Sequence, residues 1–152
     1  MPKNNPVIAK SAGSPSIFVD SSAWIALFSR LDQHHAEADR AFRTIVASRQ
    51  RIITSNLVLA EIHRLLLHRA GSRAAAVALE KIESSPLVRI VFAGSQDHAS
   101  AKAWMAKLRE HPISYADAVG FSIMEATDCC KALSYDSRFR FAGFEIISTI
   151  SR

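Results

Sequence analysis

Four acidic residues occupy positions from which a folded chain could bring their carboxylates together. Asp20 and Asp136 each follow a short apolar segment with strand propensity, and Glu61 and Asp117 lie in helical stretches on faces shared with apolar residues. Crowded carboxylates repel one another unless a hard cation neutralises them, and ligation by oxygen alone suits Mg²⁺ or Mn²⁺. We therefore predict a metal site made by Asp20, Glu61, Asp117 and Asp136.

Three of these acids also have a purely structural interpretation. Asp20 could cap the helix that follows it, and Asp117 could form a capping box with Ser114. Asp136 precedes Ser137 in a segment that could be a turn. Each of these residues alone is therefore weak support for a metal site.

Glu61 is more informative than the other acids. Helical spacing places it on one face with Leu57, Val58 and Leu65. A carboxylate on an apolar stripe is costly unless it is paired or coordinates a cation. Because two strand ends and two apolar helix faces all carry acids, the combination favours a shared site at the carboxyl edge of a parallel sheet.

The elements that would position these acids alternate along the chain. We expect strands at residues 17–19, 51–54, 87–91, 132–135 and 145–148. We expect helices at residues 23–28, 34–48, 57–69, 72–82, 97–108 and 114–126. This alternation predicts an α/β domain with a mainly parallel sheet.

Length and composition limit the remaining possibilities. A chain of 152 residues fits one domain, with residues 1–15 as a flexible, Pro-, Asn- and Ser-rich tail and residues 16–152 as the folded unit. No apolar run approaches the roughly 20 residues that span a bilayer, and the N-terminus does not resemble a secretory signal. The adjacent Cys129 and Cys130 are expected to be free thiols, which fits a cytoplasmic location.

The net charge of +5 raises the expectation of a polyanionic partner. A carboxylate-held metal can activate water and offset the charge of a phosphodiester, while basic residues outside the site hold the nucleic-acid backbone. The sequence contains no aromatic-interleaved RNA-binding box, so the residues that would bind RNA stay unidentified.

The four acidic segments, in this order and spacing, resemble the motifs of the PIN-domain ribonucleases, and in particular the small VapC-type toxins. The likeness runs from Ser16 to Ser148. It is carried by the segments Ile17–Ser22, Ile53–Glu61, Ile113–Ala118 and Leu133–Phe139.

This resemblance implies a three-layer α/β/α sandwich and a Mg²⁺- or Mn²⁺-dependent endoribonuclease that hydrolyses RNA phosphodiesters. It also implies that the four acids are the catalytic metal ligands or water-orienting groups, supported by the hydroxyls of Ser22 and Ser134. A small antitoxin encoded beside the toxin and a homodimer are further expectations. Some relatives carry another acid where this chain has Ser137 and Arg138, which leaves open whether one or two metals bind.

Two other function classes are compatible with parts of this pattern. A non-catalytic PIN-like module would bind RNA or protein without holding the metal productively, but all four acids are present here. A phosphoryl-accepting receiver domain would also carry an aspartate at a strand end. It would need a second acid near the first strand and a lysine after a late strand, and neither is found where it is needed.

Overall fold

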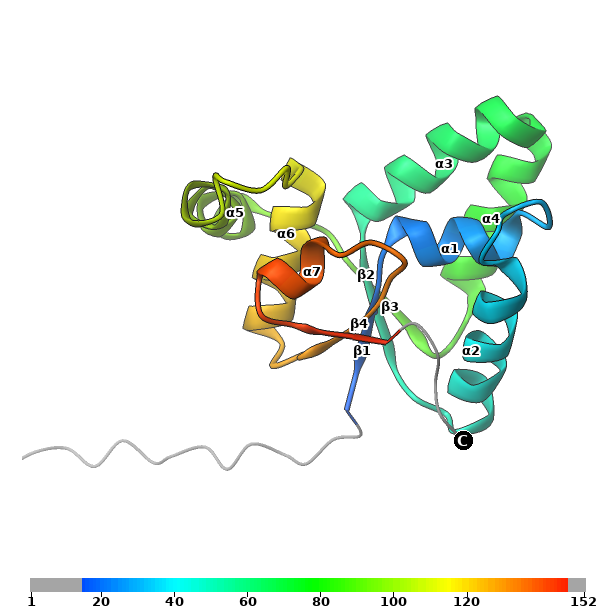
Figure 1. Cartoon of the computed structure of the whole chain (residues 1–152). Helices are drawn as coiled ribbons and strands as arrows, with labels where there is room; N and C mark the ends of the chain where they lie inside the picture. Colours follow the sequence, from blue (N-terminus) through cyan, green and yellow to red (C-terminus); the bar gives the residue numbers. More distant parts are fainter. Residues whose placement is uncertain (1–14, 148–152) are drawn as a thin grey trace, which may run out of the picture.

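The centre of the molecule is a five-stranded sheet in which every pairing is parallel (Figure 1). The computed structural model describes residues 15–147. The strands are β1 (Ile17–Val19), β2 (Ile52–Ser55), β3 (Val88–Val91), β4 (Lys131–Leu133) and β5 (Glu145–Ile147), and their order in the sheet is β3-β2-β1-β4-β5. The predicted tail at 1–15 lies outside the described residues apart from Pro15, as does the end of the predicted domain at 148–152.

Helices cover both faces of this sheet (Figure 1). The helices are α1 (Ser21–Phe28), α2 (His35–Ala47), α3 (Asn56–Ala70), α4 (Ser72–Ser84), α5 (Ser95–Lys107), α6 (Tyr115–Ala126) and α7 (Arg138–Phe141). Helices α1 to α4 pack together on one face, and α5, α6 and α7 lie on the other. The predicted α/β/α sandwich is therefore confirmed, with a wholly parallel sheet among the described strands.

Three phenylalanine rings form part of the core where β1, α6 and α7 meet. The side chains of Phe18, Phe121 and Phe139 are almost completely buried, and their ring centroids lie 5.1–5.6 Å apart in two contacting pairs. Gly120 lets the helix approach the strand closely, because a Cβ atom at this position would lie 3.1 Å from the Phe18 ring. This close approach brings the first turn of α6 over the carboxyl end of β1.

The strand order reverses at β1, which pairs with β2 on one side and β4 on the other. Ligands bind at such a switch point in open α/β folds, outside the carboxyl ends of the strands. Here Asp20 directly follows β1 and its backbone N–H donates to the Leu133 carbonyl of β4 at 3.3 Å. The segments that follow β1 and β4 therefore leave the sheet side by side.

Two differences between the expected and observed elements fall beside Asp136. Strand β4 ends at Leu133 rather than Tyr135, because the Tyr135 N–H donates to the Ser22 hydroxyl at 2.9 Å instead of continuing the ladder. The short helix α7 was not predicted, since four residues are too few to show helical periodicity. Both differences lie in the segment that carries Asp136.

Candidate active site

Asp20 is the most deeply buried acid at the carboxyl edge, with 6% of its surface exposed. Its Oδ1 accepts from the Ser22 hydroxyl at 2.6 Å and from the Ala23 N–H at 3.2 Å, and its Oδ2 accepts from the Ser134 hydroxyl at 2.6 Å. The bond from Ala23 makes Asp20 the N-cap of α1. The structural interpretation of Asp20 as a helix cap is therefore confirmed, and its role in a metal site stays a prediction.

Burial raises the pKa of Asp20 to about 6, from a usual value of 3.8. The hydrogen bonds from Ser134, Ser22 and Ala23 favour the carboxylate and limit this rise, whereas the nearby charge of Asp117 adds to it. At neutral pH the group is a carboxylate whose charge is only partly offset by its hydrogen bonds. Such a group is suited to hold a cation.

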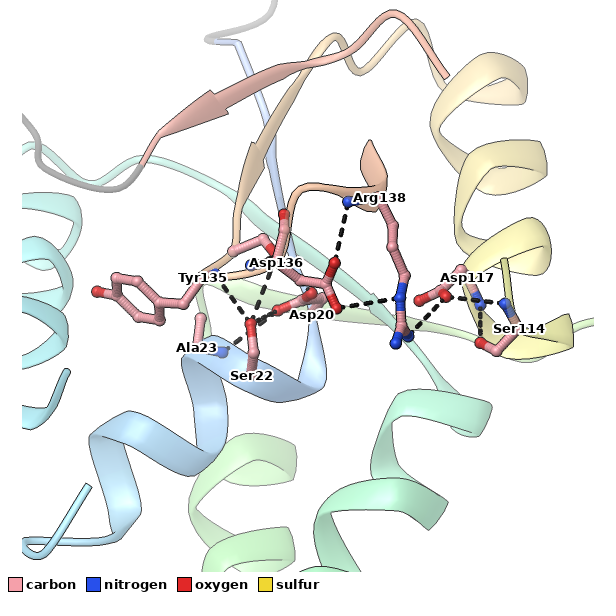
Figure 2. A network of polar contacts seen from close by, with 9 residues as sticks. Asp20, Ser22, Ala23, Ser114, Asp117, Tyr135, Asp136 and Arg138 are labelled. Atoms are coloured by element: carbon pink, nitrogen blue, oxygen red, sulfur yellow. Dashed lines mark hydrogen bonds and ion pairs between the residues drawn. The ribbon is translucent and has the colours of Figure 1, made fainter. Parts of the chain in front are cut away.

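The two hydroxyls beside Asp20 also join the segments that meet at this edge (Figure 2). Ser22 accepts from the Tyr135 N–H at 2.9 Å, and Ser134 accepts from the Asp136 N–H at 3.0 Å. Ser134 is 1% exposed. The network therefore ties the start of α1 to the loop after β4 and fixes the orientation of the Asp20 carboxylate.

Asp117 and Asp136 approach the same place from α6 and from the loop after β4. Asp117 Oδ2 accepts from the Ser114 N–H at 3.0 Å, which completes the capping box predicted for this helix. Asp136 Oδ1 accepts from the backbone N–H of Arg138 at 3.0 Å. Each acid thus has one oxygen engaged with the local backbone.

Arg138 lies between these two acids (Figure 2). Its Nη1 donates to Asp117 Oδ2 at 3.0 Å, and its Nε lies 3.2 Å from Asp136 Oδ2. Sequence reasoning did not assign Arg138 to the site. The sequence feature that could have indicated Arg138 is its position two residues after Asp136, in a segment where some relatives carry another acid.

Glu61 takes no part in the polar network that joins the other three acids. It is half-buried on α3, as expected from its apolar neighbours, but makes no hydrogen bond or ion pair within residues 15–147. Its charge still contributes to the electrostatic environment of Arg138. The structure therefore brings Asp20, Asp117 and Asp136 together, with Glu61 at the margin.

The donor chemistry fits a hard divalent cation, although the carboxylates do not converge on one point. Within the described part of the chain, no group of three or more His, Cys, Asp or Glu side chains is arranged closely enough to hold a metal ion. The Arg138 guanidinium contacts one carboxylate oxygen of Asp117 and one of Asp136. An ion that used these two oxygens would compete with the Arg138 side chain for them.

Open space adjoins the acids on one side. A depression of about 360 Å³ is lined by Asp136, Ser134, Tyr135, His34 and Arg140, among others. The rings of His34 and Tyr135 stack at 4.3 Å beside it. A larger cavity of about 830 Å³ lies between the residues after α1 and helices α3 and α4, and none of the four acids lines it. Of the four acids, Asp136 lines the smaller depression, which could admit a substrate beside it.

Comparison with known proteins places this arrangement in a family. The PIN domain family matches residues 17–145. The 23S rRNA-specific endonuclease VapC20 of Mycobacterium tuberculosis is 36% identical over 129 residues, which cover 84% of this chain and 95% of VapC20.

Solved structures agree with this assignment. The crystal structure of M. tuberculosis VapC20, described as a toxin that cleaves the sarcin-ricin loop, superposes with a TM-score of 0.74 at 34% identity and covers 84% of this chain and 95% of its own. VapBC2 from Rickettsia felis, bound to a DNA fragment from its promoter, has a TM-score of 0.67 at 13% identity, with coverage of 87% and 97%, and supports the fold alone. The chain belongs to the PIN-domain family, among its VapC-type members.

Proposed function

We propose that this protein is a metal-dependent endoribonuclease of the VapC type, the toxin of a toxin-antitoxin pair. The observation that carries the proposal is Asp20, a buried carboxylate with a raised pKa beside Asp117 and Asp136 at the switch point of a PIN fold. A buried charge of this kind is costly to the fold and is expected where a cation is to be held.

Asp20, Asp117 and Asp136 would hold the ion, and Glu61 would complete the site from α3. Mg²⁺ and Mn²⁺ are the proposed ions because all the donors are carboxylate oxygens. When bound, such an ion lowers the pKa of a water molecule and offsets charge on the phosphodiester. Ser22 and Ser134 orient the Asp20 carboxylate through their hydrogen bonds, and so act as positioning residues.

The substrate would be RNA, and we propose a structured ribosomal RNA loop by analogy with the sarcin-ricin loop that VapC20 cleaves. The net charge of +5 supports a polyanionic substrate. The depression beside Asp136, with its stacked His34 and Tyr135 rings, offers a surface on which a nucleotide could lie.

An antitoxin partner is supported by the larger cavity near α3 and α4. Leu31 at its rim is 98% exposed, and Val77 in its wall is 40% exposed, so the region presents apolar surface to solvent. We propose that this surface binds a small antitoxin, and that the toxin itself is a homodimer located in the cytoplasm. Light scattering of the purified chain tests the dimer, and co-purification with the product of the neighbouring gene tests the antitoxin.

Among residues 15–147, no helix has the length and apolar character needed to cross a membrane.

The decisive experiment compares RNA cleavage by the wild type, Asp20→Asn and Asp117→Asn, in Mg²⁺ or Mn²⁺ and in EDTA. The substrates are a sarcin-ricin-loop oligonucleotide and a mixed RNA pool. Asp39→Asn is the matched control, because Asp39 is ion-paired with Arg43 on α2 and removed from the site. Metal-dependent cleavage that is lost in both site variants and kept in the control establishes the proposal.

Circular dichroism must show that each variant is folded. The ion pairs of Arg138 with Asp117 and Asp136 favour one alternative, a non-catalytic PIN-like binding module whose acids are occupied by an internal cation. A wild type that binds RNA in both metals without cutting it, after any antitoxin is removed, supports that alternative. Cleavage that survives both substitutions shows that these acids are not the site.

A further inference from the structure

Arg138 is held by the carboxylates that are proposed to bind the metal. Its guanidinium contacts Asp117 Oδ2 at 3.0 Å and Asp136 Oδ2 at 3.2 Å, while its backbone N–H contacts Asp136 Oδ1 at 3.0 Å. The guanidinium side chain is 39% exposed, whereas the carboxylates are 14% and 30% exposed. Arg138 therefore reaches from the solvent side into the space between the acids.

The electrostatics favour a cation at this position. Burial disfavours the charged guanidinium, but the carboxylates of Asp117, Asp136 and Glu61 outweigh it, so the pKa of Arg138 is raised. The charges of three carboxylates act on this one guanidinium, and its single positive charge leaves them under-neutralised. The site therefore favours a cation of higher charge in place of the guanidinium.

A divalent ion and the guanidinium would compete for the same atoms. Hard cations bind carboxylate oxygens at about 2.0–2.6 Å, so an ion joined to both Oδ2 atoms would take the place of the Arg138 N–H groups. The like charges of the ion and the guanidinium would also repel each other. The side chain has somewhere to go, because it is part-exposed and the adjoining depression of about 360 Å³ is lined by Asp136 and Ser137.

We propose that Arg138 is the internal cation of the metal-free site and the phosphate-binding residue of the metal-loaded site. Divalent-ion binding to Asp117 and Asp136 releases the guanidinium, which then binds the oxygens of an RNA phosphate beside the acids. The planar fork of an arginine matches two phosphate oxygens, which a lysine cannot reproduce. The second half of this proposal rests on the endoribonuclease function; the first half does not.

The first test is a Mn²⁺ titration of the RNA-free protein by isothermal titration calorimetry. Arg138→Gln removes the competing charge and keeps a polar side chain, so Mn²⁺ should bind roughly tenfold more tightly than in the wild type. Arg140→Gln is the matched control: it lies on the same helix, is exposed and loses the same charge. The control should change Mn²⁺ affinity far less.

Three results overturn the competition. Weaker Mn²⁺ binding by Arg138→Gln would show that Arg138 holds the acids in place for the metal. Unchanged binding would show that the guanidinium and the ion do not share ligands. Equal tightening in Arg140→Gln would show a general charge effect. Urea unfolding of each variant separates these outcomes from a loss of folding.

The second test measures binding of a fluorescent single-stranded RNA by anisotropy, in EDTA and in Ca²⁺, with intact RNA verified on a gel. Arg138→Gln should reduce the metal-induced gain in RNA affinity roughly tenfold and lower the salt dependence by about one phosphate contact, and Arg138→Lys should restore only part of it. An unchanged gain refutes the phosphate role. If the wild type never cleaves RNA but the Mn²⁺ affinities follow the expected order, the endoribonuclease proposal fails while the competition stands.

Discussion

Replacing Asp20 with asparagine should stabilise the metal-free protein at neutral pH. The pKa of Asp20 is raised to about 6 because the carboxyl group is buried, against 3.8 in an unfolded chain. That difference corresponds to about 3 kcal/mol by which ionisation of Asp20 disfavours folding at pH 7. An amide carries no charge to desolvate, and it can still accept from Ala23 and Ser22.

The pH dependence follows from the sign of this shift. Between pH 3.8 and 6 the folded state binds more protons at Asp20 than the unfolded state does, so raising the pH through this range lowers the stability of the wild type. Asp20→Asn cannot ionise at this position and so does not lose stability in this way. Its free energy of unfolding should equal that of the wild type at pH 4 and exceed it by about 2 kcal/mol at pH 7.5, after a deduction for imperfect amide hydrogen bonding.

The assay is urea unfolding in EDTA, followed by circular dichroism from pH 4 to pH 7.5. Asp39→Asn is the control of opposite sign, because the hydrogen bond and charge of Arg43 lower the pKa of Asp39; this variant should gain no stability as the pH rises. Adding Mn²⁺ should stabilise the wild type more than Asp20→Asn, since the bound ion stabilises only the state that holds it. A difference between wild type and Asp20→Asn that stays constant from pH 4 to pH 7.5 would refute the reasoning.

Three further substitutions test the hydrogen bonds, packing and helix cap that position the predicted site residues. Ser134→Ala removes the 2.6 Å hydrogen bond to Asp20 and should raise the pKa of that acid further, which is measured as an upward shift of the pH–activity profile. Gly120→Ala places a Cβ atom 3.1 Å from the Phe18 ring and should cost about 1–3 kcal/mol in urea unfolding. Ser55→Ala removes the N-cap of α3 and should cost about 1 kcal/mol, which thermal denaturation would show as a lower Tm.

The fold was predictable because its main elements carry strong local signals. Strand Ile17–Val19 lies in the middle of the sheet and is buried on both faces, and a strand in this position requires consecutive apolar residues. Ser55 caps the start of α3 and Gly71, where φ is +90°, follows its end, and both residue types are usual at these positions. Cys129 and Cys130 are free, as predicted.

The meeting of Asp20, Asp117 and Asp136 at one sheet edge was predictable, but the contacts between them were not. The positions of Asp20 and Asp117 at the carboxyl edge follow from strand and cap signals, and the assignment of all four acids to the metal stays a prediction. No sequence pattern indicates Arg138 as a site residue, because its position there depends on a tertiary contact between α7 and α6. The position of Glu61 outside the polar network of the other acids depends on how α3 packs, which sequence spacing does not determine.

The ambiguity between cap and ligand has a physical origin in the fold itself. In a parallel sheet, helices begin at the edge where strands end, so a side chain that caps such a helix already stands at the ligand-binding edge. The partial positive charge of a helix N-terminus favours an anionic cap there. Asp20 and Asp117 use this arrangement, because Asp20 is the N-cap of α1, Asp117 completes the capping box of α6, and both face the site. The capping and site interpretations of these residues are therefore not rivals: the cap fixes the carboxylate, and a fixed carboxylate is what a metal site requires.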